Sequence, residues 1–230
     1  TILDDARAHL RSGLRRILIH SPTGSGKTVL TAAMLGKAAK QGRRAIFNVH
    51  RRELIQQSSR TFNMVGIQHA IIAAGFAGDR RQPIQLASVQ TLARRLDQIH
   101  EPEVVVWDEC HHLAAKSWEA VFNRWPKAIH IGLTATPQRL DGRGLSEFFD
   151  VMVQGPSTAT LVADGWLAPY RVFAPPGIDL TGVHTRMGDY AHSELVAAAD
   201  KPSITGDALT HYRRYLSGKR AVAFCVSVKH

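Results

Sequence analysis

Residues 21–28 read SPTGSGKT and place two glycines, a lysine and several hydroxyl side chains directly after the apolar run RILIH. Glycines let a backbone come close to a phosphate, and the N–H groups of such a loop and of the helix after it favour an anion. Lys27 adds a positive charge, and the hydroxyl of Thr28 can bind Mg²⁺. The pattern is the P-loop G-x-x-x-x-G-K-[ST], with Ser21 at the position of the first glycine. It predicts a phosphate cradle for ATP or GTP, formed by Ser21, Pro22, Thr23, Gly24, Ser25, Gly26, Lys27 and Thr28.

A pair of carboxylates forms the second group, in the stretch VVVWDECHH. Asp108 and Glu109 follow an apolar run that reads as a buried strand. One carboxylate in this position can hold Mg²⁺ beside a phosphate chain. Its neighbour can orient a water molecule and take up its proton. Because a P-loop precedes the pair, we predict that the two carboxylates serve nucleotide hydrolysis.

The surrounding sequence alternates short apolar runs with helical patterns. Apolar runs without polar alternation are typical of parallel strands covered on both faces. We expect strands at 15–20, 44–50, 68–74, 84–88, 103–109 and 128–134, and helices at 28–40, 51–63, 89–99 and 117–123. This alternation predicts an α/β fold, a parallel sheet flanked by helices. Right-handed crossovers would bring the ends of all strands, and so both groups, to one edge of the sheet.

The regular alternation of apolar runs and helical patterns ends after Asp150. A turn-rich and proline-broken stretch comes first, a helical pattern follows at about 193–216, and a fresh apolar run begins at 219. We predict an ATP-binding domain over 1–154, a linker and entry segment over 155–218, and the first core strand of a second α/β lobe over 219–230. The tryptophans at 107, 118, 125 and 166 are expected in the core.

The composition of the chain limits which partners, cellular location and metal sites are expected. The 29 Lys and Arg against 19 Asp and Glu give a net charge of +10, which favours a polyanion such as nucleic acid; a merely basic protein is the alternative. No apolar stretch is long enough to span a membrane. Two cysteines without a disulfide framework predict a reducing, cytoplasmic setting, and no Cys/His spacing predicts structural zinc.

Three motifs together resemble those of superfamily 2 helicases, the relatives of the DEAD/DEAH-box proteins. They are SPTGSGKT, DECH and GLTATPQRLDG (132–142), and the resemblance covers residues 1 to about 150 densely and the last ten weakly. It implies a RecA-like P-loop NTPase lobe followed by an incomplete second lobe. The first P-loop position is often not glycine in this family, so Ser21 fits.

The resemblance also implies roles for single residues. Lys27 and Asp108 would act on the phosphates and the metal, with Thr28 also on Mg²⁺, and Glu109 would be the catalytic base. His111 would link the nucleotide site to the other lobe. The TATP segment (134–137) and the arginine that follows it would couple hydrolysis to movement, through Thr134, Ala135, Thr136 and Arg139.

Two further segments resemble nucleic-acid-binding motifs of the same family, FNVHRREL (47–54) and ASVQTL (87–92). Two arginines at the start of a helix oppose its dipole, so a phosphate partner is expected there. The predicted nucleic-acid contacts are His50, Arg51, Arg52, Ser88, Gln90 and Thr91.

The residues of these motifs are most similar to those of the restriction-subunit-like, bacterial or phage DNA-repair branch of the superfamily. This implies an ATP-dependent helicase or translocase that acts on DNA, with ATP and Mg²⁺ as cofactors. An RNA helicase of the DECH type and a nucleic-acid-binding lobe with little ATPase activity remain alternatives. A kinase or GTPase would lack TATP, and no guanine-reading N-K-x-D is present. The adenine-reading glutamine and the second lobe's arginines would lie outside these residues, so we expect weak turnover from this chain alone.

Overall fold

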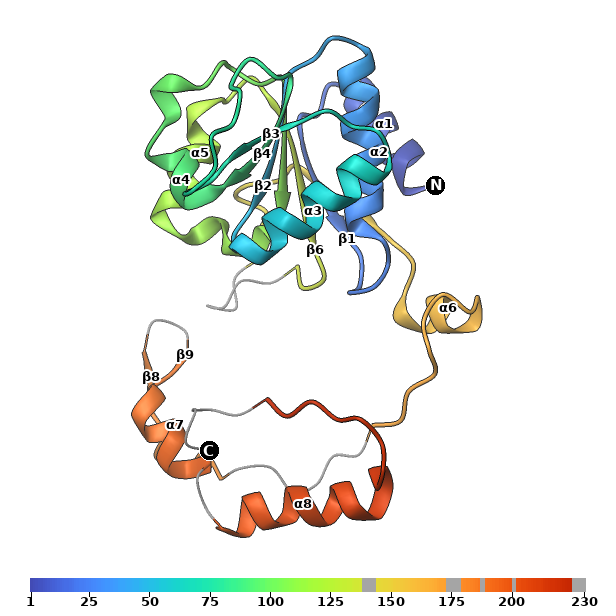
Figure 1. Cartoon of the computed structure of the whole chain (residues 1–230), viewed down its shortest axis with the longest axis vertical. Helices are drawn as coiled ribbons and strands as arrows, with labels where there is room; N and C mark the ends of the chain where they lie inside the picture. Colours follow the sequence, from blue (N-terminus) through green and yellow to red (C-terminus); the bar gives the residue numbers. More distant parts are fainter. Residues whose placement is uncertain (138–143, 173–178, 187–188, 200–201, 225–230) are drawn as a thin grey trace. The chain divides into compact units, whose positions relative to one another are not determined.

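The computed structural model describes residues 1–137, 144–172, 179–186, 189–199 and 202–224 (Figure 1). The chain divides into two compact units. One unit comprises Thr1–Arg139 and Arg143–Pro169, and the other comprises Leu140–Gly142 and Tyr170–His230. The predicted site residues belong to the first unit.

A seven-stranded sheet forms the centre of the first unit, in the order β3-β4-β2-β5-β6-β1-β7. All of its strand pairs are parallel. The strands are β1 Arg16–His20, β2 Ala45–Val49, β3 Ala70–Ile72, β4 Ile84–Ser88, β5 Val104–Asp108, β6 Ile129–Thr134 and β7 Val151–Gln154. The predicted α/β fold and all six predicted strands are confirmed.

Helices cover both faces of this sheet (Figure 1). In the first unit they are α1 Ile2–Arg11, α2 Lys27–Lys40, α3 Arg52–Met64, α4 Val89–Ala93, η1 Leu96–Gln98, η2 Cys110–Ala114, α5 Lys116–Arg124 and α6 Thr158–Ala163. Side chains of α1, α2 and α3 share one buried apolar cluster with the sheet, and α4 and α5 share a second. The two clusters hold the strand ends, and therefore the site, in fixed positions.

The second unit contains the hairpin β8 Thr185–Arg186 and β9 Asp189–Tyr190, with α7 His192–Ala199 and α8 Pro202–Leu216. The single helix expected at 193–216 is therefore two helices. Pro202 is the first residue of α8, where its missing N–H and fixed φ are tolerated. None of the described helices in either unit is long and apolar enough to cross a membrane.

Other expectations need correction. The helix expected over 89–99 ends at Ala93, and a 3-10 turn follows. Strand β7 was not predicted, because it is only four residues long and lies at the edge of the sheet, so half of its side chains stay out of the core. Trp107, Trp118 and Trp125 are buried as predicted, but Trp166 is 77% exposed.

The predicted domain boundaries remain predictions. The compact first unit continues past residue 154 to Pro169. Of the strand predicted over 219–230, residues 220–224 are without regular structure and 225–230 lie outside the described residues. A strand needs a neighbour to pair with, and no described residue pairs with this stretch.

A buried histidine packed against the second cluster makes the first unit sensitive to acid. The indole N–H of Trp107 donates to Nδ1 of His130 at 3.1 Å, so Nε2–H must donate to the Trp125 carbonyl at 2.9 Å. Both bonds need the neutral ring, and burial lowers the pKa of His130 from 6.5 to about 4.

The unfolded chain therefore binds a proton on His130 between pH 6.5 and 4, while the folded chain does not. We expect the free energy of unfolding to fall by about 3 kcal/mol across this window from this group alone. The free energy of unfolding, measured with urea from pH 7 to pH 4, should depend more steeply on pH in the natural protein than in His130→Leu. Equal pH slopes would contradict this role.

Candidate functional site

The P-loop connects β1 to α2, as its sequence predicts. Gly24 and Gly26 have φ of +82° and +81°, a left-handed conformation that favours glycine. Gly26 caps α2 without any side-chain bond, and the first turn of α2 has no acidic residue. The first N–H groups of this helix therefore remain open to an anion.

Ser21 contributes to the loop by its side chain. It is 2% exposed, and its Oγ donates to Ser25 Oγ at 2.7 Å. Its N–H donates to the Thr134 carbonyl at 3.0 Å, which ties the loop to the end of β6. A serine at the first P-loop position thus pins the loop internally.

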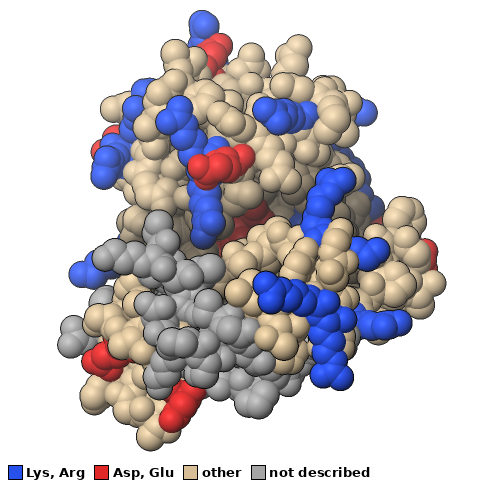
Figure 2. Space-filling view, turned by 60° about the horizontal axis from the view of Figure 1, so that its bottom comes forward, with Lys and Arg blue, Asp and Glu red and all other residues tan. Residues whose placement is uncertain are grey.

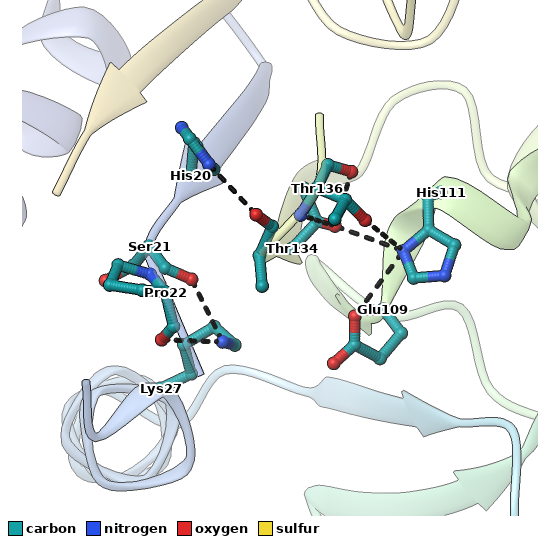
Figure 3. Close-up of polar contacts among 9 residues, drawn as sticks. His20, Ser21, Pro22, Lys27, Glu109, His111, Thr134 and Thr136 are labelled. Atoms are coloured by element: carbon teal, nitrogen blue, oxygen red, sulfur yellow. Dashed lines mark hydrogen bonds and ion pairs between the residues drawn. The ribbon is translucent and has the colours of Figure 1, made fainter. Parts of the chain in front are cut away.

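Lys27 points back over the loop (Figure 3). Its Nζ donates to the carbonyl oxygens of Ser21 at 3.0 Å and Pro22 at 3.1 Å. The Thr31 hydroxyl donates to the Lys27 carbonyl at 2.9 Å, within α2. These contacts hold a partly buried ammonium group at the mouth of the loop.

Asp108 ends β5, two strands away from β1. The register places Asp108 opposite Leu133 of β6, and Leu133 opposite Ile19 of β1, so the acid is level with the last residues before the P-loop. Burial and the neighbouring charge of Glu109 raise the pKa of Asp108 to about 6, although Lys27 acts in the opposite direction. The positive charge of Lys27 therefore favours the ionised form of this carboxylate.

Glu109 has φ of 50°, the only left-handed residue other than glycine in the described part of the chain. Such a conformation costs about 1–2 kcal/mol in an L-residue. It ends the strand and turns the carboxylate toward His111, whose Nδ1 lies 3.4 Å from Glu109 Oε2. Strain of this kind is commonly retained at functional sites.

His111 joins this carboxylate to the TATP segment (Figure 3). Its Nδ1 lies 3.1 Å from Thr134 Oγ1 and 3.5 Å from Thr136 Oγ1. The Thr134 hydroxyl donates to the Thr136 carbonyl at 2.8 Å, so Nδ1 of His111 must carry the proton and donate. Thr134 is buried, and the carbonyl of Ala135 lies 3.1 Å from His20 Nε2. Arg139 lies outside the described residues.

These residues fit a nucleotide with a divalent cation. The loop offers uncapped N–H groups and an ammonium group, which suit phosphate oxygens. Asp108 is a carboxylate whose charge is disfavoured by burial, and a cation would stabilise it. Mg²⁺ takes few protein ligands and keeps several waters, so Thr28 and Asp108 would suffice as protein ligands.

The predicted nucleic-acid residues lie at the same edge of the sheet. Neighbouring strands β2 and β4 end side by side, with Val49 opposite Ser88. The predicted contact residues lie at or just after the ends of these two strands. Arg51, Arg52 and Gln90 are exposed, and His50, Ser88 and Thr91 are half-buried. Ser88 Oγ donates to Gln90 Oε1 at 2.9 Å, and the Arg52 guanidinium lies 5.9 Å from the Phe76 ring centroid.

Positive charge is spread over the surface seen in Figure 2. Lys and Arg side chains appear there at several separate places, with neutral surface between them. The view shows no single basic patch on this face, so the predicted contacts depend on the two strand ends described above.

One histidine at this site was assigned no role from the sequence. His112 lies between His50 and His111, with ring centroids 4.9 Å and 4.2 Å away. Burial and the neighbouring positive groups lower the pKa of His112 to about 4. His112 therefore connects the predicted nucleic-acid segment to the predicted nucleotide segment. The doubled histidine of DECHH was the available signal.

Comparisons with known proteins agree with this geometry. The family model described as "Type III restriction enzyme, res subunit" matches residues 1–139. The "51.5 kDa protein" of a Lactococcus phage is 30% identical over 212 residues, which cover 92% of this chain and 44% of the phage protein. The "DNA 3'-5' translocase XPB2" of Sulfurisphaera tokodaii is 26% identical over 166 residues, covering 69% of this chain and 36% of the archaeal one. This chain thus spans less than half the length of either relative.

A solved structure shows the same fold. The Type ISP restriction-modification enzyme LlaGI, as a nuclease-deletion mutant with a DNA substrate mimic, superposes with a TM-score of 0.57 and 14% identity. The match covers 71% of this chain and 20% of LlaGI. The parallel sheet, the P-loop after β1 and the match over residues 1–139 agree: the chain belongs to the type III restriction enzyme res subunit family, and its first unit is the RecA-like N-terminal lobe of a superfamily 2 helicase.

Proposed function

We propose that this protein is an ATP-dependent helicase or translocase that acts on DNA. The observation that carries the proposal is the position of Lys27 and Asp108. They belong to separate motifs, 81 residues apart, yet the parallel register brings Asp108 level with the last residues before the P-loop that carries Lys27. A structural lobe that only binds nucleic acid would not need a half-buried carboxylate at the same sheet edge as an ammonium group and an uncapped helix.

The residues divide the work of hydrolysis. Lys27 and the N–H groups of the loop bind the phosphates and offset their charge. Thr28 and Asp108 hold Mg²⁺, which neutralises charge on the phosphate oxygens when it is bound. Glu109 orients the attacking water and accepts its proton. His111 passes the state of Glu109 to Thr134 and Thr136 through its donated bonds.

DNA is the favoured nucleic acid. The name of the archaeal relative describes a DNA translocase, and LlaGI was solved in complex with a DNA substrate mimic. We propose that phosphates of one strand bind along the ends of β2 and β4, at His50, Arg51, Arg52, Ser88, Gln90 and Thr91. Closure and opening of two lobes around ATP, coupled to hydrolysis through Thr134 and Thr136, would then move the protein along that strand.

The test is ATP turnover of the full-length protein, measured with single-stranded DNA, duplex DNA, branched DNA and RNA, each at several salt concentrations. We expect at least one of the three DNA substrates to stimulate turnover more than RNA does. Stimulation by RNA alone would favour the alternative of a DECH-type RNA helicase, and turnover that no nucleic acid changes would contradict the proposal.

The arginines at the start of α3 give a separate prediction. Each phosphate contact that a cation makes contributes about 0.7 to the slope of log K against log salt for single strands and about 0.9 for duplex DNA. Arg51→Ala and Arg52→Ala should each weaken DNA binding and lower this slope by about one contact. Arg60 is an exposed arginine farther along the same helix, so Arg60→Ala is the matched control. A slope that stays unchanged in both variants, or falls equally in the control, would contradict the proposed contacts.

A further inference from the structure

An apolar cavity of ≈ 560 Å³ adjoins the P-loop on the side of α6. Its lining consists of the loop residues Gly24, Ser25 and Gly26, the α2 residues Val29, Leu30 and Ala33, and Leu161 and Trp166. This volume is within the usual range of small-molecule sites. The cavity is therefore continuous with the proposed phosphate cradle and large enough for more than the phosphates.

Trp166 forms one wall of this cavity and is held by a defined turn. The N–H of Gly165 donates to the Val162 carbonyl at 3.1 Å, and the N–H of Trp166 donates to the Leu161 carbonyl at 2.9 Å. Gly165 has φ of +76°, so this is a Schellman motif that ends α6. The motif brings Trp166 next to Leu161 on the cavity wall.

The segment that carries Trp166 is packed directly against the P-loop. A side-chain carbon at Gly24 would lie 2.8 Å from Leu167 Cδ2, and one at Gly155 would lie 2.8 Å from Ser21 Oγ. The N–H of Gly155 donates to the His20 carbonyl at 2.7 Å. The two ends of segment 155–167 thus lie against the loop, and the tryptophan, next to Leu167, has a defined place beside it.

Two large side chains of the cavity wall remain exposed although they are apolar. Trp166 is 77% exposed and Val29 is 60% exposed, and both line the same hollow. Apart from the indole N–H, Ser25 has the only polar side chain among the described residues of the lining. A flat ring and a branched aliphatic side chain suit the faces of an aromatic base, for which hydrogen bonds are not required.

We infer that Trp166 and Val29 form the base-binding wall of the nucleotide site, with the base of the bound nucleoside triphosphate stacked on the indole. The inference rests on the proposed function, because the cradle at residues 21–28 supplies the phosphate end of the same ligand. The wall recognises an aromatic base by its face, and it orders the nucleoside while Lys27 orders the phosphates.

Comparing the binding of two ligands, ATP and tripolyphosphate, tests this inference independently of the proposed function. ATP has a base and tripolyphosphate has none, so only ATP can use the wall. Replacing an aromatic side chain that stacks on a base by alanine lowers the affinity for the ligand by roughly 5-fold or more. We expect Trp166→Ala to weaken ATP binding by at least about 5-fold and to leave tripolyphosphate binding unchanged, and Trp166→Phe to recover most of the loss. Met64→Ala removes an equally exposed apolar side chain, at the end of α3, and should change neither affinity.

Tryptophan fluorescence gives an independent measurement on the natural protein. Trp107, Trp118 and Trp125 are at most 3% exposed, so quenching by a bound base would report on Trp166. ATP should quench the emission, and tripolyphosphate should not. An unchanged ATP affinity in Trp166→Ala, or an equal loss for both ligands, would overturn the inference. Binding of neither ligand to the natural protein would overturn the phosphate cradle itself, and with it this inference.

Discussion

Glu109→Gln is expected to reduce ATP turnover by about 10²- to 10⁴-fold in the full-length protein with DNA, while ATP binding persists. Glutamine keeps the size of the side chain but cannot accept the proton of the attacking water. The replacement also removes the negative charge that raises the pKa of Asp108, so the affinity for Mg²⁺ and ATP should be retained or improved. Steady-state turnover and equilibrium ATP binding, measured on the same preparation, check both parts.

The matched control for this variant is Glu119→Gln. Glu119 lies in the first turn of α5 and is exposed, so the same chemical change there should leave turnover as it is. A Glu109→Gln protein that hydrolyses ATP at the natural rate would show that another group takes the proton. Loss of ATP binding together with turnover would instead show that Glu109 supports the loop and is not the base.

Lys27→Ala is the second large effect. Removing one partner of a charged contact costs about 2–5 kcal/mol, or roughly 30-fold or more in affinity, and phosphates in the cradle would lose their ammonium partner. The pKa of Asp108 should also rise above its present value of about 6, because Lys27 is the charge that lowers it. Metal binding at pH 7 would weaken in parallel, so turnover should fall further than binding does.

Lys37→Ala is its control, since Lys37 is an exposed lysine on the same helix. Binding of ATP and of tripolyphosphate, followed by calorimetry, should fall in Lys27→Ala and stay unchanged in Lys37→Ala. Equal affinities in the two variants would mean that residues 21–28 do not hold the phosphates.

The sheet could be predicted from the sequence because its central strands are buried on both faces. Runs such as Ile17–Ile19 and Val104–Trp107 are apolar throughout and bounded by polar residues. Strand β7 pairs with β1 alone at the sheet edge, so its burial pattern is mixed, and a run of four residues is too short for the pattern to reveal a strand. The long helical pattern at 193–216 did not reveal its interruption, since Pro202 is compatible with a helix start as well as with a kink.

The site was predictable to the level of its motifs but not of its geometry. The residue types of the P-loop and of DECH follow from phosphate and metal chemistry, and parallel topology brings them to one edge. The left-handed backbone of Glu109 and the ring contacts of His112 arise from the turn after β5, which no periodicity encodes. Trp166 was wrongly placed in the core, because aromatic type predicts burial only on average and the Schellman turn presents this ring outward.

The central claim is that residues 21–28 and the two carboxylates at 108 and 109 bind one nucleotide together with one metal ion. The most direct measurement is a crystal structure of the protein with a non-hydrolysable ATP analogue and Mn²⁺, in which anomalous scattering locates the metal. We predict phosphate density over the loop from Gly24 to Thr28 and a single strong anomalous peak between Thr28 and Asp108. Phosphates bound elsewhere, or a metal peak remote from Asp108, would contradict the account.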